Sequence, residues 1–148
     1  DLDLEIEDKG AVITIDKLFT LQGHHRQLQQ AFQNLISNAL KYNHPGTPPV
    51  VNISYKKVNG KQAGLSIPAE NHEKLFYKVL IHDNGIGFEQ ADAERIFNVF
   101  TRLHGLAEYR GTGIGLSIVR KVIENHNGYI WAESQPGQGS SFNILLPA

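Results

Sequence analysis

The chain contains 148 residues, of which 41% are hydrophobic and 20% are charged, as in ordinary globular proteins. A chain of this length buries roughly 68–70% of the surface that it exposes when unfolded, which excludes intrinsic disorder and predicts a hydrophobic core. The formal net charge of −1 argues against a nucleic-acid partner, and the absence of cysteine excludes disulfides and cysteine-based metal or redox sites.

The first half of the chain predicts a hairpin, a helix and two strands. Alternating apolar and polar residues over residues 1–16 favour a β-hairpin that turns at Asp8-Lys9-Gly10. From Arg26 to Tyr42, apolar residues recur every three or four positions and predict an amphipathic helix. Val50–Val58 and Leu75–His82 are predicted strands, and we expect the polar stretch between them to be a surface excursion of a hairpin.

The second half of the chain predicts two helices followed by two strands. Ala91–Val99 indicates a short helix, and Leu116–Asn125 returns to helical spacing. The closing strands are predicted at Tyr129–Ser134 and Ser140–Leu146. No apolar run is long enough to insert into a membrane, and no repeat or linker interrupts the pattern. We therefore expect one domain over residues 1–148, cut from a longer protein and located in the cytoplasm.

The first predicted helix carries polar side chains opposite its apolar stripe. At about 100° per residue, Asn34, Asn38 and Lys41 fall within roughly 60° of one another, and Tyr42 lies at the edge of the stripe. The two carboxamides could offer oxygen atoms to a hard cation, and the lysine could offer charge to a phosphate. Taken alone, however, the pattern favours a solvated helix face.

A second polar cluster, Asp83-Asn84-Gly85-Ile86-Gly87, follows directly after an apolar strand. A carboxylate at the end of a strand can accept a hydrogen bond from an exocyclic amine such as that of adenine. The glycines would let the backbone approach a flat ligand closely. Taken alone, this cluster is better explained as a tight turn, for which Asp-Asn-Gly is well suited.

A third cluster, Gly111-Thr112-Gly113-Ile114-Gly115, opens the second long helix, where free backbone N–H groups could face phosphates. It is not a dinucleotide-binding fingerprint, because the spacing is G-x-G-x-G and no strand precedes it. It is not a Walker loop either, because Leu116-Ser117 stands where that loop requires lysine followed by serine or threonine.

Together and in this order, the clusters resemble the sequence boxes of sensor histidine kinases, with phytochrome-type and related PAS-linked kinases the most similar. Asn34–Tyr42 resembles their N box, and Asp83–Phe88 their first glycine box. Ile96–Leu103 is similar to the phenylalanine box, and Gly111–Leu116 to the second glycine box. The ending from Gly128 to Pro147 also matches, so the resemblance covers nearly the whole chain.

The resemblance implies a Bergerat-type α/β (α+β) sandwich, a mixed sheet with helices packed on one face. ATP would bind between a helix and a lid at about Leu103–Arg110. Asn38 would be the principal ligand of Mg²⁺, with Asn34 supporting it. Lys41 would contact phosphates, and Tyr42 would pack near the adenine.

The resemblance also implies further contacts to the nucleotide. Asp83 would accept a hydrogen bond from the adenine amino group, and Arg102 would lie near the terminal phosphate as a catalytic residue with Asn34 and Asn38. The two glycine boxes would supply the remaining contacts: Gly85, Ile86, Gly87, Gly111, Thr112, Gly113, Gly115 and Leu116. Phe97 and Phe100 belong to the segment that resembles the phenylalanine box. A structural role as buried aromatic anchors of the lid explains them as well as a functional role does.

Related ATPases of this fold place a glutamate as general base one turn before the metal-binding asparagine, and here that position is Asn34, which cannot take a proton. The chain is therefore expected to transfer a phosphoryl group to an already nucleophilic imidazole. None of its seven histidines fits the phosphoacceptor pattern, and His72-Glu73-Lys74-Leu75 begins suggestively but does not continue it.

The resemblance places the acceptor histidine on a separate helical dimerisation domain of the same protein, with a response-regulator receiver domain as the downstream partner. The isolated domain would be monomeric, and it would be inactive as a kinase without the phosphoacceptor domain. Three alternatives remain: an ATPase of the same fold, a degenerate nucleotide-binding scaffold, and a plain protein-interaction module.

Overall fold

The computed structural model describes residues 10, 12–15, 25–98 and 115–148. Within these residues the chain forms two α-helices, α2 (His25–Lys41) and α3 (Gly115–Asn125). It also forms five strands: β1 (Val12–Ile15), β2 (Val50–Asn59), β3 (Leu75–Asp83), β4 (Tyr129–Ser134) and β5 (Ser140–Pro147). The strands make one sheet in the order β1-β2-β3-β5-β4, in which β1 runs parallel to β2 and every other pair is antiparallel.

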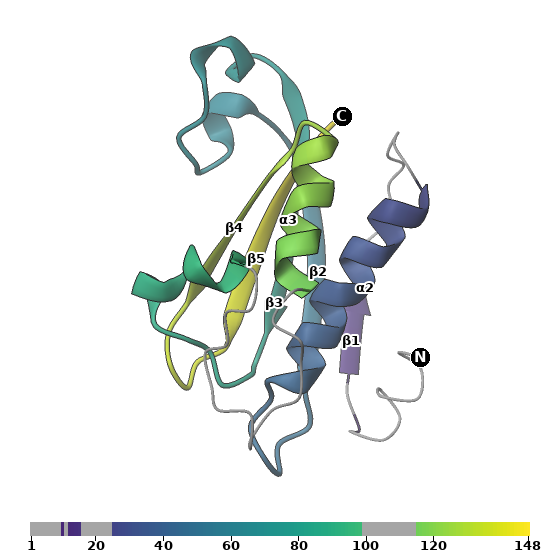
Figure 1. The fold of residues 1–148 in the computed structure, drawn as a ribbon, viewed down its shortest axis with the longest axis vertical. Helices are drawn as coiled ribbons and strands as arrows, with labels where there is room; N and C mark the ends of the chain where they lie inside the picture. The colour runs from purple at the N-terminus through teal and green to yellow at the C-terminus, as the bar shows by residue number, and fades with distance from the viewer. Residues whose placement is uncertain (1–9, 11, 16–24, 99–114) are drawn as a thin grey trace.

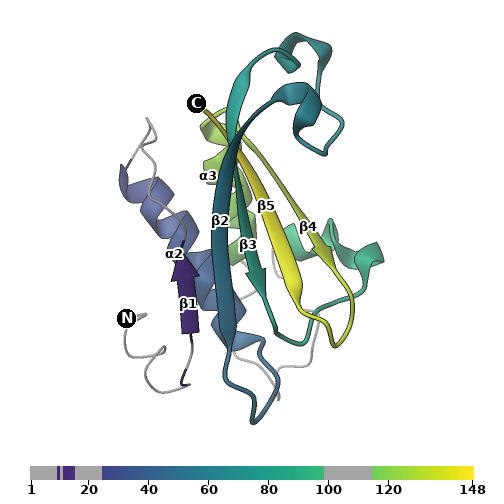
Figure 2. The same ribbon diagram turned by 180° about the vertical axis from the view of Figure 1, so that it is seen from behind.

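The molecule has two layers, with α2 and α3 side by side on one face of the sheet (Figure 1). The view from behind shows the strands in front of the helices (Figure 2). This arrangement confirms the expected sandwich, a mixed sheet with its helices on one face. The two long helices and the strands predicted after residue 49 agree with the observed bounds to within one residue.

The helical spacing of apolar residues explains why α2 packs where it does. Leu28, Ala31, Leu35 and Ala39 recur at intervals of three and four residues, and all four are buried in the main core. Val119 and Ile123 of α3 have the same spacing, and the inward-facing residues of the strands complete that core: Val51, Val79, Ile81, Ile130, Ala132, Phe142, Ile144 and Leu146. The strand residues alternate, as they must when one face of a sheet is buried.

The connection between β2 and β3 forms a second core. It contains two 3-10 turns, η1 (Gly60–Gln62) and η2 (Ala69–Asn71), and it buries Ala63 and Ile67 against Phe76 and other residues. Phe76 alternates with the inward-facing residues of β3, so this cluster lies on the sheet face opposite the helices. The expected surface excursion is therefore a packed segment that covers part of the otherwise open face.

Two further predicted segments are the short helix at residues 91–99 and the hairpin at residues 1–16. The short helix predicted for Ala91–Val99 is wrong, because the chain there forms two 3-10 turns, η3 (Gln90–Asp92) and η4 (Arg95–Phe97). The helix cannot continue because Asn98 is already extended, with φ −80° and ψ 148°. The hairpin predicted for residues 1–16 falls mostly outside the described residues, and the part that is described, β1, pairs with β2.

Side chains cover part of the outer edge of β4. The Gln90 amide donates to the carbonyl of Ala132 (Nε2–O 3.2 Å) and accepts from the backbone N–H of Ser134 (N–Oε1 2.9 Å). Arg120 of α3 donates to the carbonyl of Ile130 (3.4 Å). Three backbone groups that a further strand would bind are thus already engaged.

Candidate functional site

The end of α2 lies against the loop that follows β3. The carbonyl of Tyr42, the residue after α2, accepts a hydrogen bond from the backbone N–H of Ile86 (2.9 Å). A Cβ atom on Gly85 would lie 2.3 Å from that carbonyl oxygen and 2.8 Å from Oδ1 of Asp83. Only glycine fits at this position, so the sequence brings the end of the helix and the first glycine box into direct contact.

Asp83 ends β3 on the helix-covered face and is only 5% exposed. Its Oδ1 accepts a hydrogen bond from the backbone N–H of Gly85 (2.8 Å). Burial raises the pKa of the Asp83 carboxyl, and the backbone bond from Gly85, the charge of His82 and a backbone bond from Ser140 oppose that shift. The result is a buried carboxylate with lone pairs still available to a ligand that donates hydrogen bonds.

The turn between β4 and β5 supports the first glycine box from the other side. Gly87 has φ +69°, and a Cβ there would lie 2.2 Å from the carbonyl oxygen of Gln135. The N–H of Gly137 donates to the carbonyl of Ile86 (2.6 Å). A Cβ on Gly139 would lie 2.0 Å from the carbonyl oxygen of Asp83. Backbone therefore packs directly on backbone here, which is why glycines recur on both sides.

Asn84 of the first glycine box and two serines that the sequence analysis missed complete this support. The hydroxyl of Ser134 accepts from the N–H of Phe88 (2.9 Å), donates to the carbonyl of Gly139 (2.6 Å) and lies 3.1 Å from Oγ of Ser140. Asn84 accepts from the N–H of Val50 (2.8 Å). The serines gave no sequence signal, because only the strand register brings Ser134, Ser140 and Asp83 together.

The polar residues of α2 lie as the helical spacing predicts. Asn34 and Asn38 are half-buried one turn apart, and Lys41 is exposed at the end of the helix. Neither carboxamide has a hydrogen-bond partner among the residues that the structure describes. Amide oxygens are hard donors that suit Mg²⁺, which usually keeps phosphate and water oxygens as its other ligands. The two side chains therefore fit a metal that arrives with a triphosphate.

Several predicted site residues lie outside the described residues, namely Arg102, Gly111, Thr112 and Gly113. So do Phe100 and the proposed lid at about Leu103–Arg110. The remaining two members of the second glycine box, Gly115 and Leu116, begin α3, and Leu116 packs against the main core.

Phe97 behaves as an anchor. It is 3% exposed, and its ring packs edge-on against Phe142 with centroids 6.1 Å apart. The guanidinium of Arg120 lies 4.1 Å from the centre of the same ring and also forms a two-pronged ion pair with Glu94 (3.2 Å for each contact). For Phe97, burial thus supports the anchor interpretation, and Arg120 ties η4 to α3.

The side chains of His82 and His72 contact groups outside the candidate site. His82 points to the face opposite the helices, where its Nδ1 contacts the hydroxyl of Ser141 (2.8 Å). The Nε2 atom of His72 contacts the carbonyl of Ile67 within the β2–β3 connection (2.9 Å). Neither ring is a candidate catalytic group, in agreement with the sequence analysis.

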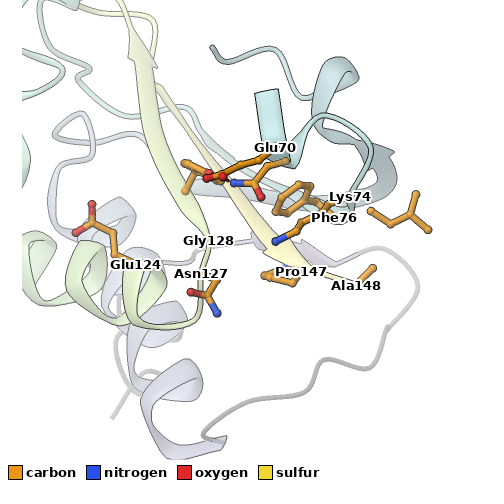
Figure 3. Close-up of a pocket in the computed structure, with 11 residues that line it drawn as sticks. Glu70, Lys74, Phe76, Glu124, Asn127, Gly128, Pro147 and Ala148 are labelled. Carbon is orange, nitrogen blue, oxygen red and sulfur yellow. Dashed lines mark hydrogen bonds between the residues drawn. The ribbon is translucent and has the colours of Figure 1, made fainter. Parts of the chain in front are cut away.

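A pocket of about 650 Å³ opens at the other end of the sheet (Figure 3). Figure 3 shows its charged side chains, Glu70, Lys74 and Glu124, around the start of β3 and the end of β5. Leu75 and Asp83 are the first and last residues of β3, so roughly 26 Å separates this pocket from the candidate site. The pocket therefore belongs to a different region of the molecule.

In the part of the chain that the structure describes, no three His, Asp or Glu side chains gather into a metal-binding group. None of the described helices has the length and apolar character that crossing a membrane requires.

Comparison with known proteins places these features in a family. The family described as "Histidine kinase-, DNA gyrase B-, and HSP90-like ATPase" matches residues 23–148. Over 147 residues the chain is 37% identical to phytochrome-like protein Cph1 of Synechocystis sp., covering 99% of this chain and 18% of Cph1. It is 41% identical over 142 residues to cyanobacterial phytochrome A of Nostoc sp., covering 96% of this chain and 16% of that protein.

Solved structures show the same fold. The mycobacterial sensor histidine kinase MprB superposes with a TM-score of 0.71 at 24% identity, covering 99% of this chain and 90% of that structure. Full-length ShkA in complex with AMPPNP gives a TM-score of 0.73 at 22% identity, covering 99% of this chain and 27% of ShkA. The chain spans less than a fifth of the two phytochrome relatives. It belongs to the histidine kinase-, DNA gyrase B- and HSP90-like ATPase family, as an ATP-binding domain of the sensor histidine kinase type.

Proposed function

We propose that this domain binds Mg·ATP and transfers its γ-phosphoryl group to a histidine on a separate dimerisation domain of the same protein. The observation that carries the proposal is the buried Asp83 carboxylate beneath a glycine loop. An acceptor buried beside a backbone without side chains suits a flat base that presents an exocyclic amine. Gly85, Ile86 and Gly87 would line the adenine, and Tyr42 would pack at its edge.

The phosphate end of the nucleotide would lie along α2. Asn38, supported by Asn34, would hold Mg²⁺, which would neutralise charge on the phosphate oxygens. Lys41 would add a positive charge beside them. The further contacts proposed for the second glycine box and Arg102 stay predictions: Gly111, Thr112, Gly113, Gly115, Leu116 and Arg102.

Asn34 supports a kinase over an ATPase. A carboxamide has no basic site near neutral pH, so it cannot take the proton from an attacking water. An imidazole needs no such base, because its ring nitrogen attacks directly. The P–O bond to ADP then breaks as the P–N bond forms, and the imidazole proton leaves to solvent. Positioning and charge neutralisation would supply most of the catalysis.

The partners follow from the family and the chemistry. The acceptor would be a helical dimerisation domain, and a response-regulator receiver domain would take the phosphoryl group from it. The isolated domain would be monomeric, because dimerisation would depend on that helical domain. We place the domain in the cytoplasm, where its nucleotide substrate is found.

The test is a phosphotransfer assay with γ-labelled ATP, in which this chain is mixed with the helical histidine domain encoded upstream. Acid-labile, base-stable label on the helical domain is the expected result. Free phosphate without labelled protein would indicate an ATPase of the same fold. Bound ATP with neither product would indicate a nucleotide-binding scaffold.

A further inference from the structure

The pocket at the far end of the sheet is built from parts of the chain that the candidate nucleotide site does not use. Its lining comes from η2 and the start of β3, and from the end of α3, the start of β4 and the end of β5 (Figure 3). Its volume of about 650 Å³ is within the range of pockets that hold ligands. A ligand in this pocket would therefore be distinct from the nucleotide.

The pocket is preformed, because contacts within the fold hold its lining in place. The side-chain amide of Asn71 donates to the hydroxyl oxygen of Tyr129 (2.8 Å), and the ring of Tyr129 packs edge-on against Phe76 with centroids 6.1 Å apart. A Cβ atom on Gly128 would lie 2.2 Å from the carbonyl oxygen of Leu145, so only glycine lets the chain after α3 come this close to β5. A ligand therefore meets a surface that it does not have to order.

The charged groups that line the pocket do not balance. Glu70, Lys74 and Glu124 line it, and none of the three forms an ion pair with another described residue. Glu124 stands in the last turn of α3, which contains no basic residue, although the C-terminal end of a helix carries a partial negative charge. Two carboxylates and a helix end thus outweigh one ammonium group, and the pocket attracts a cation.

Apolar surface lies beside these carboxylates. Leu75 is 52% exposed, and Pro147 is exposed at the end of β5. Long basic side chains pack a hydrocarbon stem on apolar surface and keep the charged head at its edge. Arginine suits two carboxylates better than lysine does, because its planar guanidinium carries five N–H donors that can bind both at once.

The exposure of these groups decides what kind of ligand would bring the guanidinium. Glu70, Leu75 and Glu124 are all exposed. An ion pair in open water is weak because water screens it, so a free cation would gain little here. A protein segment that also covers Leu75 would exclude water from the two carboxylates and so strengthen their attraction for the cation.

We propose that this pocket binds an arginine side chain presented by a protein partner, with the guanidinium between Glu70 and Glu124 and the stem along Leu75. The ammonium group of Lys74 repels the guanidinium and limits the affinity. The inference does not depend on the proposed function, because none of the residues that line the pocket belongs to the candidate nucleotide site.

The probe is the capped tripeptide leucine-arginine-leucine, and its matched control carries citrulline, the neutral isostere, in place of arginine. Each peptide is titrated into the isotopically labelled 148-residue chain and followed by the chemical shifts of the backbone amides. We expect shifts at Leu75, Asn127 and Gly128, and about tenfold tighter binding of the arginine peptide. Acetyl-arginine amide, which lacks the leucines, is expected to bind about tenfold more weakly than the tripeptide.

Substitutions at the rim test the charges one at a time. Glu70→Gln and Glu124→Gln are each expected to weaken binding of the arginine peptide about threefold. Lys74→Gln is expected to strengthen it by a similar factor, because the repelling charge is lost. Glu89→Gln makes the same change in net charge as the other glutamate variants, but at an exposed position before η3, and is expected to leave the affinity unchanged. The amide spectrum of each variant reports whether the fold is intact.

The outcomes are distinct. Equal affinities for the two tripeptides, or shifts confined to residues outside the pocket, would overturn the inference. So would an equal loss of affinity in Glu89→Gln and Glu124→Gln, because that result would reflect net charge alone. Acetyl-arginine amide that binds as tightly as the tripeptide would indicate a small-molecule site and overturn the assignment to a protein partner. These titrations contain no nucleotide, so a negative phosphotransfer assay would leave their result unchanged.

Discussion

At the scale of single residues, the site depends on a few polar groups held by backbone. Asp83 is fixed by the N–H of Gly85, and Gly85 in turn has no room for a side chain beside the carbonyl of Tyr42. A substitution at one of these positions is therefore expected to displace the residues in contact with it.

Asp83→Asn is expected to weaken Mg·ATP binding by roughly 1–3 kcal/mol, or about 5- to 150-fold. The amide that replaces the carboxylate presents a donor where the adenine amine also donates, so one buried polar group is left unmatched. Titration calorimetry on both proteins measures the difference. An affinity equal to that of the unmodified chain would place the adenine pocket elsewhere.

The same variant also tests the electrostatics of folding. Because burial raises the pKa of Asp83, the folded chain holds this proton more tightly than the unfolded chain does. The contribution of Asp83 to the free energy of unfolding therefore falls as the pH rises from the ordinary aspartate value through the raised one. Asp83→Asn lacks this loss, so its melting temperature relative to the unmodified chain is expected to increase across that range. A difference between the two melting temperatures that stays constant with pH would contradict a raised pKa for Asp83.

Asn38→Ala is expected to leave the fold intact, because the side chain is only half-buried and has no partner among the described residues. Its carboxamide oxygen is the proposed metal ligand, so the dependence of ATP affinity on Mg²⁺ is expected to disappear. Calorimetric titrations with and without Mg²⁺ provide the comparison. The same metal effect in both proteins would remove Asn38 from the metal site.

At the scale of secondary-structure elements, Arg120 joins α3 to η4. Its guanidinium lies over the ring of Phe97, pairs with Glu94 and bonds the carbonyl of Ile130 on β4. Arg120 therefore links α3 to η4 and to β4 through side-chain contacts.

Arg120→Ala is expected to lower the free energy of unfolding by about 1–2 kcal/mol, mostly through the lost contact with Phe97. Glu94→Ala is the matched control, because the Glu94 side chain is 77% exposed and its ion pair contributes at most about 1 kcal/mol. Urea denaturation of both variants gives the two values. A larger loss for Glu94→Ala would show that the ion pair, and not the aromatic contact, fixes Arg120.

At the scale of the whole molecule, the sheet carries a core on each face. The core beneath the helices adjoins the candidate site, and the core of the β2–β3 connection lies on the opposite face near the other end of the strands. The two clusters share no residue. Substitutions in the second core are therefore expected to lower the stability of the fold without changing its affinity for nucleotide.

Ile67→Ala is expected to cost about 2–3 kcal/mol of stability, because Ile67 is 7% exposed and packs in that second core. The affinity of the variant for ADP is expected to stay unchanged, since none of the described residues of the candidate site belongs to this cluster. Thermal melting and calorimetry on the same sample measure both quantities. Ser66→Ala, at an exposed neighbouring position, is the control for stability.

Local periodicity accounts for most of what could be predicted. The spacing of apolar residues in α2 and α3 is dictated by burial on one face, so the sequence reveals it. Strand β5 is buried on both faces from Phe142 to Leu146 and is revealed by its short apolar run. Periodicity did not predict the second core within residues 60–74. That segment is mostly polar, and its buried residues Ala63 and Ile67 are isolated in the sequence. At residues 91–99 the apolar spacing suits one helix, but the chain buries Ile96 and Phe97 from a shorter 3-10 turn.

Some residues of the candidate site could be named from the sequence, and others could not. Asn38 and Asp83 are named from the sequence only because three clusters, each explained structurally when taken alone, occur together in the order of the sequence boxes of histidine kinases. Ser134 and Ser140 could not be named, because their meaning comes from strand pairing across β3, β5 and β4. A hydrogen-bond relay depends on register, and register is a property of the folded sheet.

The glutamine at the outer edge of β4 also affects how these molecules behave together. Sheets polymerise into fibres when an exposed strand of one molecule pairs with an exposed strand of the next. At β4 an incoming strand would first have to displace the amide of Gln90 and the guanidinium of Arg120 from the backbone. Both are intramolecular bonds, so a neighbour gains little by replacing them. Growth into fibres through this edge is therefore expected to be disfavoured even at high protein concentration.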